Sequence, residues 1–167
     1  MTTRPTNSSS DQLVVLPWRD PLIERLGHDA LGDYVEVFWL GILGPTATWM
    51  LRRLARIAGA HPDGHRVDLA STAAALGLGW DASRTNAFAR ALQRLVMFGL
   101  ARHMNGAVAV RTVVPPLSVR QLSRLPERLQ RAHALWSDVD NFAALSVAHD
   151  LHDEHGDETT TVSVSAS

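Results

Sequence analysis

Arginine and amide side chains recur at helical spacing in one part of this 167-residue chain. Nine of the sixteen arginines fall between Arg84 and Arg131, against a single acid, Glu127. A guanidinium pairs through two hydrogen bonds with a phosphate or with guanine, and the amides of Asn and Gln pair in the same way with adenine. A helix is predicted over 83–98, and its outward face carries four side chains of these types. They are Asn86, Arg90, Gln93 and Arg94.

Further basic side chains flank this predicted helix. Arg84, near its start, is expected to hold a phosphate with the help of the positive end of the helix. A hairpin is predicted over 100–114, because Asn105-Gly106 is the strongest signal for a two-residue turn. Three basic side chains lie on the hairpin and are expected to contact a nucleic-acid backbone or minor groove. They are Arg102, His103 and Arg111.

A stripe of four arginines follows the hairpin. Ser118 and Gln121 form a capping box that predicts a helix start. The arginines then lie within about 80° of arc on a continuous helix, although Pro126 interrupts the pattern and can divide it between two helices. The stripe either extends a phosphate-binding surface, or is a solvated face, or pairs with acids after Ala132. Its members are Arg120, Arg124, Arg128 and Arg131.

Several kinds of chemistry are excluded by composition. The absence of cysteine excludes disulfides, thiolate metal sites and cysteine nucleophiles, and the absence of lysine excludes P-loop, Schiff-base and lysine-base chemistry. The sequence has no G-x-S-x-G, Gly-rich phosphate loop or H-E-x-x-H motif. His149, His152 and His155 drift around a helix by about 60° per step, which disfavours a metal site. We therefore expect no enzyme, no catalytic residue, no cofactor and no metal.

Charge is segregated along the chain, although the net charge is only −1. Residues 84–131 carry nine Arg and one Glu, whereas residues 132–167 carry seven acids and no Arg. The acidic segment is expected to be a disordered end, and the alternative is that it masks the basic segment in cis. We expect a single domain over 13–150 between a disordered tail over 1–12 and an acidic, Ser/Thr-rich tail over 151–167.

The predicted elements follow a recognisable order. Leu13–Trp18 is an extended apolar run, Asp20-Pro21 starts a short helix, and Asp33 with Glu36 resembles a capping box before an apolar helix at Tyr34–Leu43. Periodicity and turn residues then predict a helix, a short strand, two helices and the hairpin. Their ranges are 46–59, 66–67, 69–76, 83–98 and 100–114.

This order resembles winged helix-turn-helix DNA-binding domains. The span 34–136, with FWLGILGPTATWMLRRLA and PPLSVRQLSRLPERLQRAH, also resembles a group of uncharacterised actinobacterial winged-helix proteins. The resemblance implies a mainly α fold with a small β-hairpin wing. It places the winged-helix core over 45–116, with added helices on both sides.

Resemblance and charge together predict a protein that binds double-stranded DNA, as a transcriptional regulator. The helix over 83–98 is expected in the major groove and the hairpin on the backbone or minor groove. Many such proteins are homodimers, and two segments are either dimer surfaces or core: the helix at Tyr34–Leu43 and the segment after Pro126. Apolar residues of that second segment are Leu129, Trp136, Val139 and Phe142.

The alternative is a protein-interaction adaptor on a winged-helix scaffold. An open, positive surface at the four outward residues of the 83–98 helix favours DNA, and burial of these residues favours the adaptor. No apolar run approaches the roughly 20 residues of a membrane span, and the N-terminus lacks the order of a secretory signal. We therefore expect no membrane partner and a cytoplasmic protein, associated with the nucleoid when bound. The sequence identifies no small-molecule effector.

Overall fold

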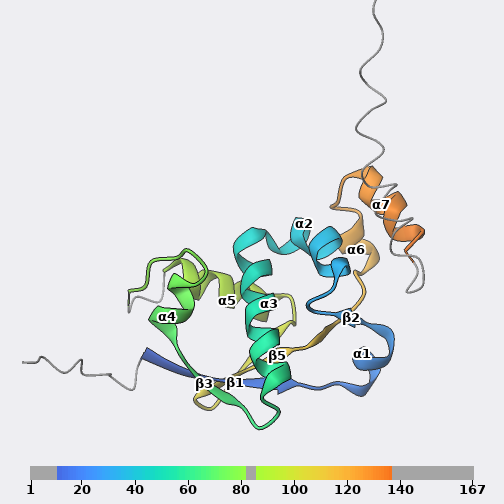
Figure 1. Ribbon diagram of the computed structural model, residues 1–167. Helices are drawn as coiled ribbons and strands as arrows, with labels where there is room; N and C mark the ends of the chain where they lie inside the picture. The colour runs from blue at the N-terminus through green and yellow to red at the C-terminus, as the bar shows by residue number, and fades with distance from the viewer. Residues whose placement is uncertain (1–10, 82–85, 137–167) are drawn as a thin grey trace, which may run out of the picture.

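A four-stranded mixed sheet supports the helices in the computed structural model, which describes residues 11–81 and 86–136 (Figure 1). The order of the strands is β3-β1-β5-β4. Strand β1 is antiparallel to β3 and parallel to β5, and β5 is antiparallel to β4. The strands are β1 (Gln12–Trp18), β3 (His65–Asp68), β4 (Ala101–Met104) and β5 (Ala107–Arg111).

The extended run at Leu13–Trp18 is therefore confirmed as a strand, and it occupies the interior of the sheet. Val15 is fully buried and pairs with Val108, so the apolar character of this segment reflects helices on one face. Pairing with β3 ends at Val15, so Pro17 lies where one edge of β1 has no strand neighbour and a missing N–H is tolerated. Strand β1 begins at Gln12, inside the segment predicted as a tail.

The predicted hairpin forms with the expected turn. Gly106 adopts φ +71°, which the turn between β4 and β5 requires and glycine adopts without strain. Its second strand ends earlier than predicted, at Arg111. Strand β6 (Val113–Val114) instead pairs with β2 (His28–Asp29) in a separate two-stranded sheet. The expectation of a mainly α fold with only a hairpin is thus too simple, because the sheets make this an α+β fold.

Two predicted helices are confirmed on one side of the sheet. Helix α3 (Pro45–Ala60) begins after Gly44 at φ +77°, and its apolar stripe, which includes Met50 and Leu54, is buried. Helix α4 (Leu69–Ala74) begins where the Asp68 carboxylate accepts a hydrogen bond of 2.7 Å from the Ser71 N–H. Hydrogen bonds from the hydroxyl and from the N–H of Ser71 hold the pKa of Asp68 below its usual value, although burial opposes the shift.

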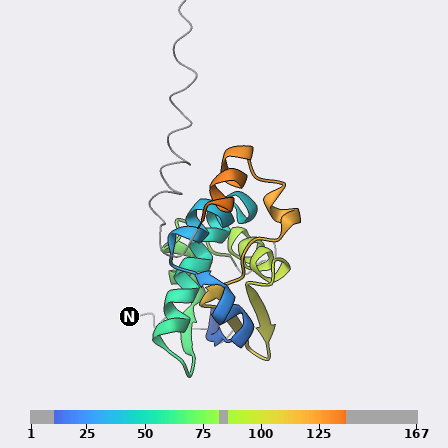
Figure 2. The same ribbon diagram turned by 90° about the vertical axis from the view of Figure 1, so that its right-hand side faces the viewer.

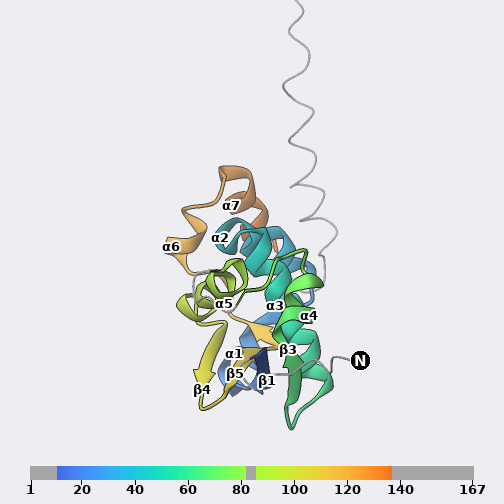
Figure 3. The ribbon, with the colours of Figure 1, turned by 90° about the vertical axis from the view of Figure 1, so that its left-hand side faces the viewer.

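Helix α5 (Ala87–Met97) starts later than predicted. Its N-cap is Asn86, whereas the prediction began the helix at Ser83. Residues 82–85, with Arg84, lie outside the described residues. Figure 2 shows α3 on one side of the molecule and α5 with β4 on the other, and Figure 3 shows the same arrangement from the opposite direction.

Two helical segments lie between β1 and α3. Helix α1 (Pro21–Leu26) is capped by Asp20 as predicted, with Pro21 at its first position. The predicted apolar helix at Tyr34–Leu43 forms, but its first part is a π-helical turn, Val35–Trp39, which continues into α2 (Leu40–Leu43). No side-chain hydrogen bond caps the start of this helix, so the predicted capping box of Asp33 and Glu36 does not form. The Glu36 carboxylate instead lies 3.7 Å from the guanidinium of Arg52.

The C-terminal stripe is divided between two helices. Ser118 and Gln121 form the predicted capping box at α6 (Val119–Leu122). Pro126 then serves as the N-cap of α7 (Glu127–Ala134), so the four arginines do not share one continuous helix. Helix α7 ends at Ala134, and residues 137–167, with Val139 and Phe142 of the segment after Pro126, lie outside the described part of the chain.

Tyr34 anchors these C-terminal helices to the core. Its hydroxyl accepts a hydrogen bond of 2.8 Å from the Leu117 N–H and lies 2.7 Å from Nε2 of His133. Its ring also stacks on His28 at 3.6 Å and meets the edge of Trp136 at 5.7 Å. Burial raises the pKa of Tyr34 and lowers that of His133.

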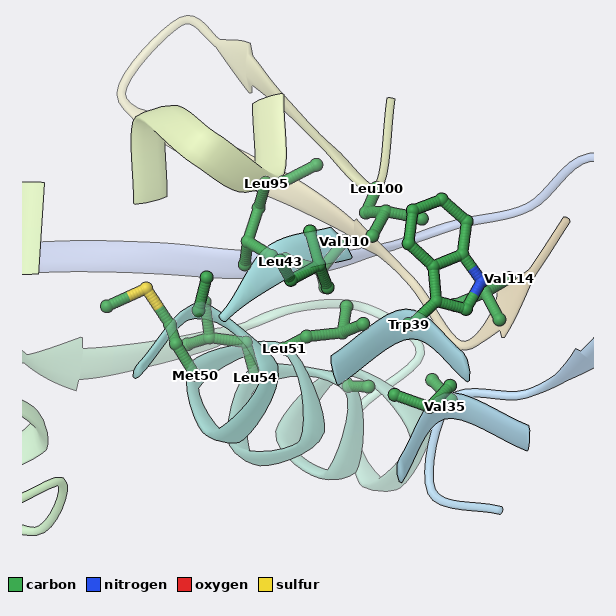
Figure 4. Close-up of a cluster of buried hydrophobic side chains, with 14 of the residues drawn as sticks. Val35, Trp39, Leu43, Met50, Leu51, Leu54, Leu95, Leu100, Val110 and Val114 are labelled. Atoms are coloured by element: carbon green, nitrogen blue, oxygen red, sulfur yellow. The ribbon is translucent and has the colours of Figure 1, made fainter. Parts of the chain in front are cut away.

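Figure 4 shows the centre of the core, where side chains of several elements meet. The apolar residues of Tyr34–Leu43, considered as a dimer surface or as core, are core, since all but Val37, Leu40 and Gly41 are buried. Within the described residues, no helix is long and apolar enough to cross a membrane. The labelled core residues are Val35, Trp39, Leu43, Met50, Leu51, Leu54, Leu95, Leu100, Val110 and Val114.

Candidate nucleic-acid interface

The outward face of α5 presents an exposed basic and amide pair. Arg90 and Gln93 are exposed, and Met97, two turns beyond Arg90 on the same face, is 66% exposed. The opposite face packs into the core through Phe88, Ala91, Leu92 and Leu95. Two of the four predicted contact residues of this helix are therefore accessible to a partner.

Asn86 is not an outward contact residue. It is only 7% exposed, and its side-chain oxygen accepts a hydrogen bond of 2.7 Å from the Ala89 N–H. Its amide nitrogen donates to the carbonyl of Asp81 at 2.6 Å. The prediction is wrong here because an amide at a helix start satisfies the free N–H groups of the first turn.

Arg94 is likewise occupied within the fold. Its Nη2 donates to the carbonyl of Ile42 at 2.7 Å, and its guanidinium lies 5.5 Å from the centre of the Phe98 ring. Ile42 belongs to the last turn of α2, where carbonyl groups lack helical partners. Arg94 therefore ties α5 to the end of α2, but it is only half-buried and also lines the hollow beside α5, so its contact with a base stays a prediction.

Arg111 is a structural residue, contrary to the prediction that it contacts a ligand. It is 8% exposed, and its Nε donates to the carbonyl of Gly99 at 2.8 Å. Both terminal nitrogens lie 3.4 Å from one carboxylate oxygen of Asp20, and the guanidinium lies 3.8 Å from the centre of the Trp18 ring. Arg111 thus joins the end of β5 to the end of β1.

Asp20 is held in its charged form at this junction. Its carboxylate accepts hydrogen bonds from the Ile23 and Leu22 N–H groups and faces Arg111. The Ile23 N–H lowers the pKa of Asp20 most, burial opposes the shift, and Leu22 and Arg111 lower the pKa further. A charged Asp20 both caps α1 and neutralises Arg111.

The two remaining basic residues of the hairpin lie on opposite faces of β4. His103 is exposed and pairs with Val108, so it is directed to the same side of the sheet as the helices. Arg102 is exposed on the other face, with its guanidinium 4.6 Å from the centre of the Trp18 ring. Only His103 therefore shares a surface with α5.

An open groove of 960 Å³ follows the outward face of α5. Arg90, Gln93 and Met97 line one side of the groove, and Pro45 at the start of α3 lines the other. His103 of β4 also lines the groove. The sequence interpretation missed Met97 and the start of α3; the seven-residue spacing from Arg90 was the available signal for Met97.

The Arg stripe continues this surface only in part. Arg120 and Arg124, on and just after α6, are exposed, and α6 lies on the same side of the molecule as α5 and β4 (Figures 2 and 3). Arg128 and Arg131 are exposed on α7, where Arg131 lies 3.8 Å from Glu127. The face of α5, β4 and α6 is the strongest candidate interface.

Known proteins add no further constraint. Comparison with protein-family models, with curated proteins and with solved structures gives no significant match to this chain. Within the described ranges, no group of three or more His, Asp or Glu side chains is arranged to hold a metal ion. A function for this chain must therefore be argued from the geometry of the face itself.

Proposed function

We propose that this protein binds double-stranded DNA as a winged-helix protein and acts as a transcriptional regulator. One observation carries the proposal: Arg90 and Gln93 are exposed on the outward face of a helix that leads directly into a hairpin. In this arrangement α5 enters the major groove, and the β4–β5 hairpin is the wing beside it. The order α3, β3, α4, α5 and hairpin supports the winged-helix assignment.

The proposed contacts differ in what they recognise. Arg90 is suited to the two acceptors of guanine and Gln93 to adenine, so these side chains supply sequence preference. His103, Arg120 and Arg124 lie at the edges of the face and supply contacts to phosphates, which carry affinity but no sequence information.

Selection from a random duplex pool tests this proposal. The full chain is incubated with the pool at about 50 mM and about 200 mM salt, and the retained duplexes are sequenced. We expect a defined motif whose retention falls with salt. Arg90→Ala should relax the preference at one base position, whereas Arg124→Ala should weaken binding to every duplex and flatten the salt dependence.

A matched control removes a charge elsewhere. Arg25→Ala, on the exposed face of α1, should leave both the motif and the salt dependence unchanged. Absence of retention at the lower salt concentration would exclude DNA binding. An unchanged motif with Arg90→Ala would exclude the assigned orientation of α5.

One observation favours a second function, that of a protein-interaction adaptor. Met97 lines the groove and is 66% exposed, and exposed methionines at a groove suit an apolar partner helix. An adaptor would retain no duplex at low salt, and Met97→Asp would abolish capture of its partner. Retention of a defined duplex motif would favour DNA binding over the adaptor function.

A further inference from the structure

A second hollow, of 780 Å³, lies between α3 and the residues just after α4, Ala75 and Leu76. Figure 3 shows α4 and α5 at opposite edges of the molecule, and the two hollows share only the first turn of α3, at Pro45 and Thr46. Six side chains define its chemistry: Trp49, Arg52, Arg53, Arg56, Ile57 and Leu76. This hollow takes no part in the DNA contacts proposed above.

Among the described residues, the hollow is lined by three arginines and by no acidic side chain. Arg53 and Arg56 are exposed, and within the described residues neither makes a hydrogen bond or an ion pair. Arg52 is largely satisfied, since it donates to the carbonyl of Gly32 at 3.1 Å and lies 3.7 Å from Glu36. Arg56 also borders a third hollow that Glu24 and Asp29 line, but no ion pair joins it to either acid, so the guanidinium groups of Arg53 and Arg56 remain for an anion.

An exposed indole stands beside these guanidinium groups. Trp49 is 58% exposed on α3, and the guanidinium of Arg52 lies 5.6 Å from its ring centre. Ile57 and Leu76 are half-buried and add an apolar wall. A flat aromatic ring would stack on this indole while its anionic group reached the arginines.

We propose that this hollow binds a small ligand that combines an aromatic ring with phosphate groups, the chemistry of a nucleotide. Its volume lies within the range of about 300–1,000 Å³ that is typical of small-ligand sites. Planar guanidinium groups are well suited to phosphate oxygens. The site is independent of the proposed DNA contacts and stands or falls separately from them.

Titration of the full chain with three probes tests whether the hollow needs both an aromatic ring and phosphate groups in its ligand. Adenosine diphosphate supplies ring and charge, adenosine supplies the ring alone, and inorganic pyrophosphate supplies charge alone. We expect adenosine diphosphate to bind about tenfold or more tightly than either partial probe, because charge-assisted hydrogen bonds and stacking add. Calorimetry gives the affinities, and the Trp49 indole N–H signal in NMR spectra locates the site.

Variants separate this site from general anion binding. Arg53→Gln combined with Arg56→Gln should weaken adenosine diphosphate binding about tenfold or more. Arg19→Gln combined with Arg25→Gln removes the same charge from exposed positions around α1 and should leave the affinity for adenosine diphosphate unchanged. Trp49→Ala should weaken adenosine diphosphate binding but leave pyrophosphate binding as it was.

Three results would overturn the proposal. Equal affinity for pyrophosphate and adenosine diphosphate would mean that the arginines bind any anion. Equal weakening by both arginine pairs would mean that only net charge matters. Loss of duplex retention in the Arg53/Arg56 variant, without any nucleotide binding, would assign these arginines to the DNA interface.

Discussion

At the scale of the residue, the surroundings of each arginine decide what it does. Arg111 is surrounded by a carbonyl, a carboxylate and an aromatic face, whereas Arg53 on α3 has no hydrogen-bond or ion-pair partner among the described residues. The residue type is the same in the two cases. An arginine is structural where the fold places hydrogen-bond acceptors around its guanidinium, and it can bind a ligand where the fold places none.

Arg111→Met should destabilise the fold. The substitution keeps much of the side-chain volume but leaves the Gly99 carbonyl without its donor, which costs about 1–3 kcal/mol when such a group is buried. We expect a lower free energy of unfolding in urea, whereas Arg120→Met, at an exposed position, should change it little. Equal stability of the two variants would argue against the structural role of Arg111.

His133 should make stability sensitive to mild acid. Burial lowers its pKa in the folded protein, so the unfolded chain takes up a proton first as the pH falls through about 6.5. The free energy of unfolding should therefore be highest above this pH. It should decrease as the pH falls from about 6.5 to the lower pKa that His133 has in the folded protein. His133→Gln keeps a hydrogen-bonding group near Tyr34 but does not titrate, and it should show a smaller fall.

Urea unfolding of the two proteins at pH 7, 6 and 5 measures this difference. Asp20 and Asp68 do not interfere, since their lowered pKa values move the associated loss of stability to more acidic conditions. The same pH dependence in both proteins would rule out a contribution from His133.

At the scale of the element, α5 depends on polar groups at both of its ends. Asn86 satisfies its first turn, and Arg94, near its last turn, connects it to the end of α2. These two residues hold the helix so that Arg90 and Gln93 are directed outward. The orientation of the proposed interface thus rests on residues whose polar groups are engaged within the fold.

Asn86→Ala should separate the capping role from a reading role. Loss of an N-cap costs about 1 kcal/mol, and Asn86→Ser should recover part of it because serine also caps helices. Thermal unfolding monitored by circular dichroism measures the change. If Asn86 instead contacts a base, Asn86→Ser should lose the sequence preference completely. It should then be no more stable than Asn86→Ala.

Local signals explain which elements were predictable. Asp20-Pro21, Asp68 and Asn105-Gly106 fix their elements by short-range hydrogen bonds and backbone preferences, and the corresponding predictions are confirmed. The interior position of β1 was not predictable, because an apolar extended run does not specify its partner strands. The roles of Arg94 and Arg111 were also hidden, because their acceptors belong to distant segments.

At the scale of the whole molecule, β1 connects the two halves of the sheet. It lies between β3 and the β4–β5 hairpin, and Arg111 with Trp18 fixes the end of this junction. The candidate DNA face and the second hollow therefore share one sheet as support. Weakening β1 should affect both surfaces together.

Hydrogen exchange tests the interior position of β1. Amides of Val14 and Val15 should be protected as strongly as those of Val108 and Val110, because all four residues are paired with a strand on both sides. Amides of β4, an edge strand, should include faster-exchanging positions. Rapid exchange of β1 with slow exchange of β5 would show that β1 is not an integral part of the sheet.

The parallel pairing of β1 with β5 has a consequence for synthesis of the protein. Gln12–Trp18 is made before its parallel partner, Ala107–Arg111, which emerges only after most of the described chain has followed. At about 5–20 residues per second, β1 waits several seconds with an apolar strand unpaired on that edge. Newly made chains are therefore most exposed to aggregation in this interval, and slower translation would lengthen it.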